Sequence, residues 1–334
     1  MIADEQTREI TYLAAVREVL AEALESDPRV ILMGEEIGVY GGVFRATEGL
    51  LERFGQDRVR DTPICEASFV GAAIGAAIVG RRPVVEIEFM DFIACAMDPI
   101  VNHAAKLRAM SGGQLRVPLI IRTQGGIGTR HGAQHSQMLE SWFTHVPGLL
   151  VVMPATPQDV KGLFRTALTV DDPVLFIEHR LLYRTKGLVT HPVEPVPFGR
   201  AAIRRQGQDV TIVATSFMTV RVLEASDELA KEGIEVEVID PRTLVPLDLQ
   251  TIVQSVRRTH RLLVVHEEVE RSGWGAEVIA LVIAEAFDDL DAPPQRLATK
   301  NVPIPFGPSL EAVVVPSTPD VVRAARKLVT GADT

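Results

Sequence analysis

The run VPLIIRTQ, from Val117 to Gln124, indicates the fold class of this chain. Its apolar residues follow one another, whereas a strand with one exposed face would alternate apolar and polar residues. Continuous apolar runs are typical of parallel strands that helices cover on both faces. Similar short runs, with stretches of helical length between them, begin at Arg29, Arg82, Leu149, Pro173, Val210, Ile234 and Arg261. The pattern predicts an α/β protein.

The length of the chain and one proline-rich segment predict two domains. The chain has 334 residues, 46% of them hydrophobic and 23% charged, which is enough for roughly two domains with separate cores. The segment GLVTHPVEPVPF, from Gly187 to Phe198, is rich in proline and has no helical period. Because proline fixes φ and lacks a donor, this segment should be an extended connector. We predict two doubly wound domains, residues 1–185 and 201–334, joined by a linker over 186–200.

Composition excludes several classes of protein. Lys and Arg total 34 against 44 Asp and Glu, a net charge of −10 with no basic cluster, so no nucleic-acid partner is expected. The longest uncharged helical candidate, Phe69 to Gly80, is shorter than the ~20 residues of a membrane span and should be a buried helix.

The compartment is predicted from the amino terminus and the cysteines. The start MIADEQTREI resembles neither a secretory signal nor a transit peptide. Cys65 and Cys95 have no ligand-like spacing, which fits a reducing compartment without disulfides or a cysteine zinc site. We therefore expect a cytoplasmic protein.

The segment RDTPICEASFVGAAIGAAIVG, from Arg60 to Gly80, contains the first candidate site residue. Thr62 and Pro63 are expected to be the N-cap and first residue of a helix, which places Glu66 in its opening turns. The helix dipole favours a carboxylate there, and such a placement is also common for structural reasons alone. Glycines cost helix propensity by roughly 1 kcal/mol each, so a ligand or another backbone is expected against a face of small residues, namely Gly71, Ala72, Gly75, Ala76 and Gly80.

A glycine-rich loop after the run at Val117 contains the second candidate. It includes His131 and His135, and loops at the carboxyl ends of parallel strands are where α/β proteins build sites. The spacing of its glycines does not match the G-x-G-x-x-G dinucleotide fingerprint, which counts against a nicotinamide dehydrogenase. A lone loop histidine is often only a surface residue. His135 has the more polar setting, between Gln134, Ser136 and Gln137.

Long, ordered stretches of the chain resemble one enzyme family. They are GEEIGVYGGVFRATEGLLERFGQDRVRDTPICE, RRPVVEIEFMDFIACAMDPIVNHAAKLR, QHSQMLESWFTHVPGLLVVMPATPQDVKGL, DDPVLFIEHRLLY and EVEVIDPRTLVPLD. The chain resembles the β subunit of the thiamin-diphosphate-dependent 2-oxo acid dehydrogenases, the decarboxylating component of the pyruvate, branched-chain 2-oxo acid and acetoin dehydrogenase complexes. The resemblance covers nearly the whole chain.

The resemblance implies a fold, a partner and a set of site residues. It implies a pyrimidine-binding domain followed by a transketolase C-terminal-like domain, in a heterotetramer of two α and two β chains. By position, Glu66 matches the glutamate that binds the aminopyrimidine ring of the cofactor, and Phe92 matches the aromatic residue that stacks on that ring. His135 matches the histidine that faces the thiazolium carbon, and Glu35 matches a second carboxylate on a proton path between paired sites.

The resemblance also implies a structural potassium site made largely of backbone carbonyls. By position it maps to Leu119, Ala167, Leu168, Val170 and Asp172. Two of these positions depart from the family pattern, because Val170 replaces an aspartate and Asp172 replaces an asparagine.

The residue types agree with thiamin chemistry, in which the cofactor reacts as a thiazolium ylid and the protein controls protons. A glutamate that shares a proton with the pyrimidine nitrogen must keep that proton near neutral pH. We expect burial of Glu66 among Ile64, Ala67 and Gly71 at the cofactor site to favour this. His135 would donate or accept a proton as the acyl group passes to lipoyl sulfur.

The sequence lacks the Gly-Asp-Gly stretch with which related chains hold magnesium diphosphate. The cofactor is therefore expected at an interface, with Mg²⁺ held by the α subunit. The small-residue helix Gly71–Gly80 and the stretch Asp98–Met110 are candidates for contact surface, and the resemblance implies that the domain from Ala201 onward docks the acyltransferase core.

The predicted function is oxidative decarboxylation of a 2-oxo acid with reductive acylation of lipoyl groups, with pyruvate favoured as substrate. Acetoin and branched-chain 2-oxo acids remain alternatives, because the acyl pockets differ by little more than methylenes. A catalytically idle scaffold subunit is the alternative of another class.

Overall fold

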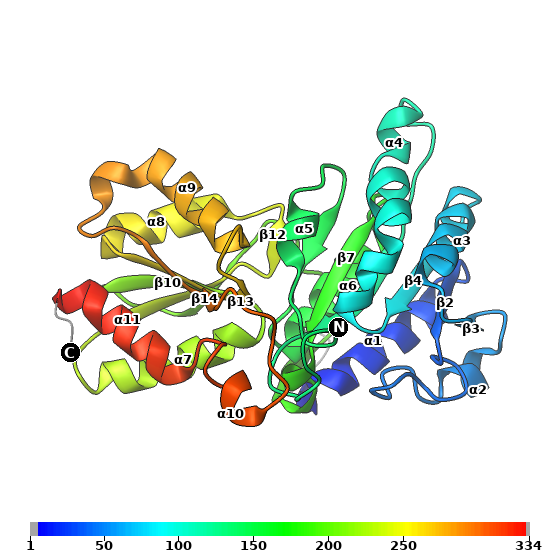
Figure 1. Ribbon diagram of the computed structural model, residues 1–334. Helices are drawn as coiled ribbons and strands as arrows, with labels where there is room; N and C mark the ends of the chain where they lie inside the picture. The colour runs from blue at the N-terminus through cyan, green and yellow to red at the C-terminus, as the bar shows by residue number, and fades with distance from the viewer. Residues whose placement is uncertain (1–5, 332–334) are drawn as a thin grey trace. The chain divides into compact units, whose positions relative to one another are not determined.

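The computed structural model describes residues 6–331 (Figure 1). The first residues of the amino terminus, from which we expected no leader, lie outside the described part. The chain forms two compact units. Unit 1 comprises the residues up to Gly125 and Trp142–Phe198, and unit 2 comprises Gly126–Ser141 and the residues from Gly199 onward.

A twisted parallel sheet forms the centre of unit 1, in the order β6-β7-β5-β4-β2-β3. Its strands are β2 (Val30–Glu35), β3 (Val59–Thr62), β4 (Arg82–Ile87), β5 (Ile120–Gly125), β6 (Leu150–Val152) and β7 (Val174–His179). Every residue of β5 and β7 is buried, which explains their continuous apolar runs. A separate antiparallel pair joins β1 (Gln6–Thr11) to β8 (Lys186–His191).

The helices of unit 1 connect these strands. They are α1 (Tyr12–Ser26), α2 (Leu50–Phe54), α3 (Glu66–Ile78), the 3₁₀ helix Met90–Ala96, the π-helix Pro99–Ala104, α4 (Leu107–Met110), α6 (Pro157–Ala167) and the 3₁₀ helix Arg180–Arg184. Helix α5 (Glu140–Thr144) begins in unit 2 and ends in unit 1. Helices α1 and α6 lie side by side, and the buried Lys161 ammonium joins them by bonds of 2.8 Å to Glu18 and 2.6 Å to Glu22.

Unit 2 has its own sheet, in the order β14-β13-β10-β11-β9, which is parallel except for the edge strand β9. Its strands are β9 (Ala202–Arg205), β10 (Val210–Ala214), β11 (Val236–Asp240), β13 (Leu262–Val269) and β14 (Gln295–Thr299). The remaining elements are β12 (Thr243–Val245), α7 (Phe217–Ala230), α8 (Leu249–Thr259), α9 (Trp274–Ala286), the 3₁₀ helix Phe287–Asp289, α10 (Pro308–Glu311) and α11 (Thr318–Thr330). Helices α7 and α11 cover one face of the sheet, and α8 and α9 cover the other (Figure 1).

The predicted α/β class is confirmed, and each of the eight apolar runs contains a strand. Two local predictions were wrong, and one pair of strands was not predicted. Thr62 is not an N-cap but the last residue of β3, and α3 begins at Glu66 after Cys65, whose side chain makes no capping bond. The predicted buried helix is buried on one face only, since Gly71, Ala72 and Gly75 are exposed. The predicted connector begins with a strand, β8, whose partner β1 was not predicted.

Other predictions stay untested. The two compact units of the structure do not decide the predicted domain boundaries, which remain predictions. Cys65 and Cys95 are both free thiols, and the cytoplasmic location remains a prediction. No helix in the described range is both long and apolar enough to cross a membrane.

Candidate active site

Two buried carboxylates meet at the carboxyl edge of the unit 1 sheet. Glu35 is the last residue of β2 and pairs in register with Thr62, the last residue of β3. Glu66 then opens α3. Because parallel strands end at the same edge, the short connection after β3 places Glu66 beside Glu35, and each residue is only 8% exposed. The sequence predicted both as site residues, and the structure brings them to one edge.

The Glu35 carboxyl can exchange a proton near neutral pH. Burial raises its pKa to about 7, and the negative charges of Glu66 and Glu36 add to the shift. Its Oε1 atom is buried and has no hydrogen-bond partner in the described protein. A buried oxygen without a partner is costly in a folded protein, so this atom fits a ligand donor or a transferable proton.

Glu66 is not buried by the residues that we expected. Ile64 is 79% exposed, and Ala67 and Gly71 are exposed as well, so that expectation is wrong for this chain by itself. No atom lies within 4 Å of a Cβ placed at Gly71 or Gly75. The small residues instead form an open face of α3 that continues from Glu66, and a ligand or a second chain can approach it.

The 3₁₀ helix Met90–Ala96 extends the same site. Partial burial raises the pKa of the Cys95 thiol, and the negative charges of Glu66 and Glu35 add to the shift. Cys95 is therefore close enough to the two glutamates to interact with them electrostatically. Phe92, on the same short helix, is half-buried, and its amide donates to Phe89 O at 2.9 Å. The sequence did not predict Cys95, because a lone cysteine without ligand spacing gives no signal. Stacking of Phe92 on a cofactor ring remains a prediction.

A buried ionic network lies behind this edge. The Arg122 guanidinium, 1% exposed, donates to Glu178 at 2.7 and 3.0 Å and to Glu86 at 2.6 Å. The Tyr183 hydroxyl donates to Glu178 at 2.8 Å. Each buried charge therefore has charge-assisted partners, which joins β4, β5 and β7 across the sheet.

Glu88 adds a neutral acid to this network. Burial and the negative charge of Glu86 raise its pKa to about 9, so its carboxyl is protonated at neutral pH. The Val43 amide donates to Glu88 Oε1 at 3.2 Å, which links the network to the loop after β2. Sequence reasoning missed this group, although the two glutamates within the apolar run RPVVEIEF were a signal.

The predicted histidine loop belongs to unit 2. His135 is half-buried in an irregular segment, and its amide donates to Gly132 O at 3.4 Å. His131 is exposed, with Nδ1 2.8 Å from Thr129 Oγ1. The loop borders a cavity of about 310 Å³ lined by Ala133, Gln137, Met138, Leu139, Glu267, Val269, Thr299 and Asn301–Ile304. Of the two histidines, His135 is therefore the more confined.

The predicted potassium positions are largely occupied by the protein's own groups. Leu119 O accepts from Val174 N at 2.8 Å, and Val170 O accepts from the Arg82 guanidinium at 3.0 Å. The Asp172 carboxylate is paired with Arg108. Ala167 and Leu168 end helix α6. The positive guanidinium of Arg82 on the Val170 carbonyl does not favour a potassium ion at the same oxygen. The potassium site itself remains a prediction.

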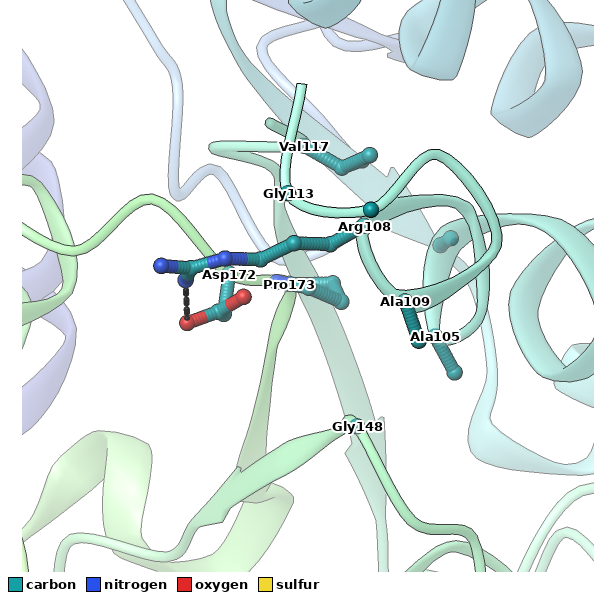
Figure 2. Close-up of a pocket in the computed structure, with 10 residues that line it drawn as sticks. Ala105, Arg108, Ala109, Gly113, Val117, Gly148, Asp172 and Pro173 are labelled. Carbon is teal, nitrogen blue, oxygen red and sulfur yellow. Dashed lines mark hydrogen bonds and ion pairs between the residues drawn. The ribbon is translucent and has the colours of Figure 1, made fainter. Parts of the chain in front are cut away.

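A second cavity, of about 510 Å³, lies at the amino ends of the strands of the unit 1 sheet, away from the carboxyl ends where Glu35 and Glu66 lie (Figure 2). Val117, Gly148 and Pro173, which precede β5, β6 and β7, line it together with small residues and the Arg108–Asp172 pair. Gly148 has φ +99°, and a Cβ there would lie 2.0 Å from Ala105 O, so the wall requires glycine. Because α/β proteins bind ligands at carboxyl ends, this cavity is not part of the candidate site.

Two protein families match this chain. Residues 8–186 match the pyrimidine-binding domain of transketolase, and residues 199–321 match the transketolase C-terminal domain. A solved structure described as a split gene transketolase, inactive β4 tetramer, superposes with a TM-score of 0.78 at 25% identity, covering 96% of this chain and 98% of that one.

Named relatives extend over nearly the full length. The pyruvate dehydrogenase E1 component subunit beta of Rickettsia felis is 45% identical over 320 residues, which is 96% of this chain and 98% of the relative. The mitochondrial subunit beta-2 of Oryza sativa is 45% identical, over 96% of this chain and 86% of the relative. The acetoin:2,6-dichlorophenolindophenol oxidoreductase subunit beta of Cupriavidus necator is 44% identical, over 97% and 98%.

Proposed function

Because this chain belongs to the family of thiamin-diphosphate-dependent 2-oxo acid dehydrogenase β subunits, we propose that it supplies the acid/base half of a shared active site. The proposed reaction is decarboxylation of a 2-oxo acid, after which the lipoyl disulfide of an acyltransferase takes up the acyl group and is reduced as that group is oxidised. The chain is active only together with an α subunit.

The observation that carries this proposal is the Glu35–Glu66 pair. Burial of Glu35, with the nearby negative charge of Glu66, raises the pKa of Glu35 to about 7. An enzyme that moves protons near neutral pH needs a group of this kind. A catalytically idle scaffold would gain nothing from an unpartnered buried oxygen, which argues against that alternative.

The family resemblance supports a role for each candidate residue. Thiamin diphosphate, when bound, supplies the carbanion chemistry as a thiazolium ylid. Glu66 would share a proton with the pyrimidine nitrogen of the bound cofactor, and Glu35 would give and take protons along the path beyond it. Phe92 and Ile64 would hold the pyrimidine ring, and His135 would donate or accept a proton during transfer to lipoyl sulfur.

The partner surfaces are proposed from exposure and sequence. The α subunit holds Mg²⁺ and the diphosphate, because this chain has no Gly-Asp-Gly stretch. The open small-residue face of α3 and the nearby Val79, 80% exposed, support a contact with another chain there. We assign docking of the acyltransferase core to the domain from Ala201 onward.

Pyruvate is the proposed substrate, with acetoin and branched-chain 2-oxo acids as alternatives. Relatives named for pyruvate and for acetoin are both about equally similar to this chain. The assembled α/β enzyme should therefore be assayed against pyruvate, acetoin and 3-methyl-2-oxobutanoate with an artificial electron acceptor. Highest kcat/KM for pyruvate supports the proposal, and no turnover of any of the three, with cofactor and magnesium saturating, would refute it.

A further inference from the structure

Four glutamates of unit 2 surround the loop that contains His135. They are Glu140, Glu267, Glu268 and Glu311, and each is at least nine-tenths buried. They come from three different elements, α5, β13 and α10. Buried carboxylates need hydrogen-bond donors. Glu267, Glu268 and Glu311 each accept a hydrogen bond from a backbone amide of the loop or of its end.

Glu311 binds the most unusual part of the loop backbone. Its Oε1 accepts from Gly128 N at 3.0 Å and from Arg130 N at 3.2 Å. Both residues have positive φ, +106° at Gly128 and +61° at Arg130. A left-handed conformation is rare for a residue with a side chain and persists only where its surroundings fix it. Two amides that converge in this way form an anion-binding nest, and the Glu311 carboxylate fills it.

The other glutamates fix the two ends of the loop. Ile127 N donates to Glu267 Oε1. The Ile127 side chain is 2% exposed in the unit 2 core. At the far end, Ser141 N donates to Glu268 Oε1 at 2.8 Å, and Trp274 N donates to the other oxygen of Glu268 at 2.9 Å. Burial and the charge of Glu268 raise the pKa of Glu140 well above its usual range, and burial also raises the pKa of Glu268.

We propose that Glu311 is a positioning residue for His135, because its carboxylate holds the Gly128–Arg130 turn and thereby sets the path of the loop to the imidazole. Glu267 and Glu268 hold the ends of the same loop. The inference rests on the proposed catalytic role of His135, which lies between the fixed turn and Ser141.

The test uses the assembled α/β enzyme with bound cofactor. Glu311→Leu removes the acceptor oxygen, whereas Glu311→Gln keeps one. Glu237→Leu is the matched control, because Glu237 is also buried in unit 2 but pairs with Arg258 and does not contact the loop. If Glu311→Leu fails to fold, Glu311→Asp is used, because its shorter side chain withdraws the carboxylate without removing the charge.

Two readouts separate positioning from general stability. Hydrogen exchange of the 127–139 segment should rise on the order of 10-fold or more in Glu311→Leu, and should stay unchanged in the Glu237 control. The kcat for lipoyl acylation should fall on the order of 10- to 100-fold with little change in KM, as expected for a displaced catalytic group. Glu311→Gln should restore both to within about threefold. Adding Glu311→Leu to His135→Ala should cause little further loss.

Unchanged exchange of the 127–139 segment in Glu311→Leu would overturn the inference, as would a Gln variant as impaired as the Leu variant. Failure of the proposed function is distinguishable, because His135→Ala would then acylate lipoyl groups normally while the exchange result still decides the role of Glu311.

Discussion

Replacing Glu35 by glutamine should stabilise the folded chain while it impairs the enzyme. Glutamine keeps the shape of the side chain but does not ionise. In the folded chain the pKa of Glu35 is about 7, against 4.5 for an ordinary glutamate, with burial as the largest cause. The folded state therefore binds more protons than the unfolded state between these two values. Stability contributed by Glu35 is present below pH 4.5 and is lost as pH rises towards 7.

The size of the effect follows from the shift. Each pKa unit corresponds to about 1.4 kcal/mol, so the wild-type chain should lose about 3 kcal/mol relative to Glu35→Gln between pH 4.5 and pH 7.5. Above that range the difference should stay constant. Urea unfolding of both chains at half-unit steps of pH gives the difference directly.

The control is Glu52→Gln, which removes an exposed carboxylate of α2 and leaves Glu35 and the charges that raise its pKa in place. Its stability relative to wild type should vary with pH by a few tenths of a kcal/mol at most. A difference between wild type and Glu35→Gln that does not change from pH 4.5 to 7.5 would refute the argument that Glu35 is kept protonated by burial.

Three further predictions concern individual residues. Glu66→Gln should still bind the cofactor in the assembled enzyme but lower kcat by the 10²–10⁴ typical of lost acid/base assistance, and near-normal turnover at saturating cofactor would contradict its role. His135→Ala should slow lipoyl acylation on the order of 10²-fold without loss of the fold, whereas His131→Ala, the control, should change it less than about threefold. The free energy of unfolding of Glu88→Gln should rise relative to wild type by on the order of 1 kcal/mol per pH unit from pH 5 to 9, because the raised pKa of Glu88 makes its ionisation unfavourable to folding. A difference in the free energy of unfolding that does not change with pH would count against a neutral Glu88.

The buried parallel strands could be predicted because burial on both faces leaves a continuous apolar run, as in β5 and β7. Strand β3 was missed, since its sequence VRDT is short and polar, only Val59 of it is buried, and it is held at the edge of the sheet by pairing with β2. The same omission placed the predicted helix start at Pro63, whereas α3 begins at Glu66. Edge strands β1 and β8 are also half-exposed and depend on each other over a long sequence separation.

Candidate site residues were predictable where a motif or a family position marks them, as for Glu35, Glu66 and His135, and their roles stay predictions. The partners of the histidine loop were not, because Glu311 is about 180 positions away along the chain and an isolated glutamate in a sequence has no distinguishing signal. Glu88 was missed for a different reason. The charge of Glu86, two positions away, was visible in the sequence, but the burial that is the largest cause of the raised pKa of Glu88 was not.

The central claim is that this chain holds only the acid/base half of the cofactor site. Calorimetric titration of thiamin diphosphate with Mg²⁺ into the purified chain, alone and after addition of an α subunit, tests it most directly. The account predicts weak, magnesium-independent binding to the chain alone and tight, magnesium-dependent binding once the α subunit is present. Tight, magnesium-dependent binding to the chain alone would contradict it.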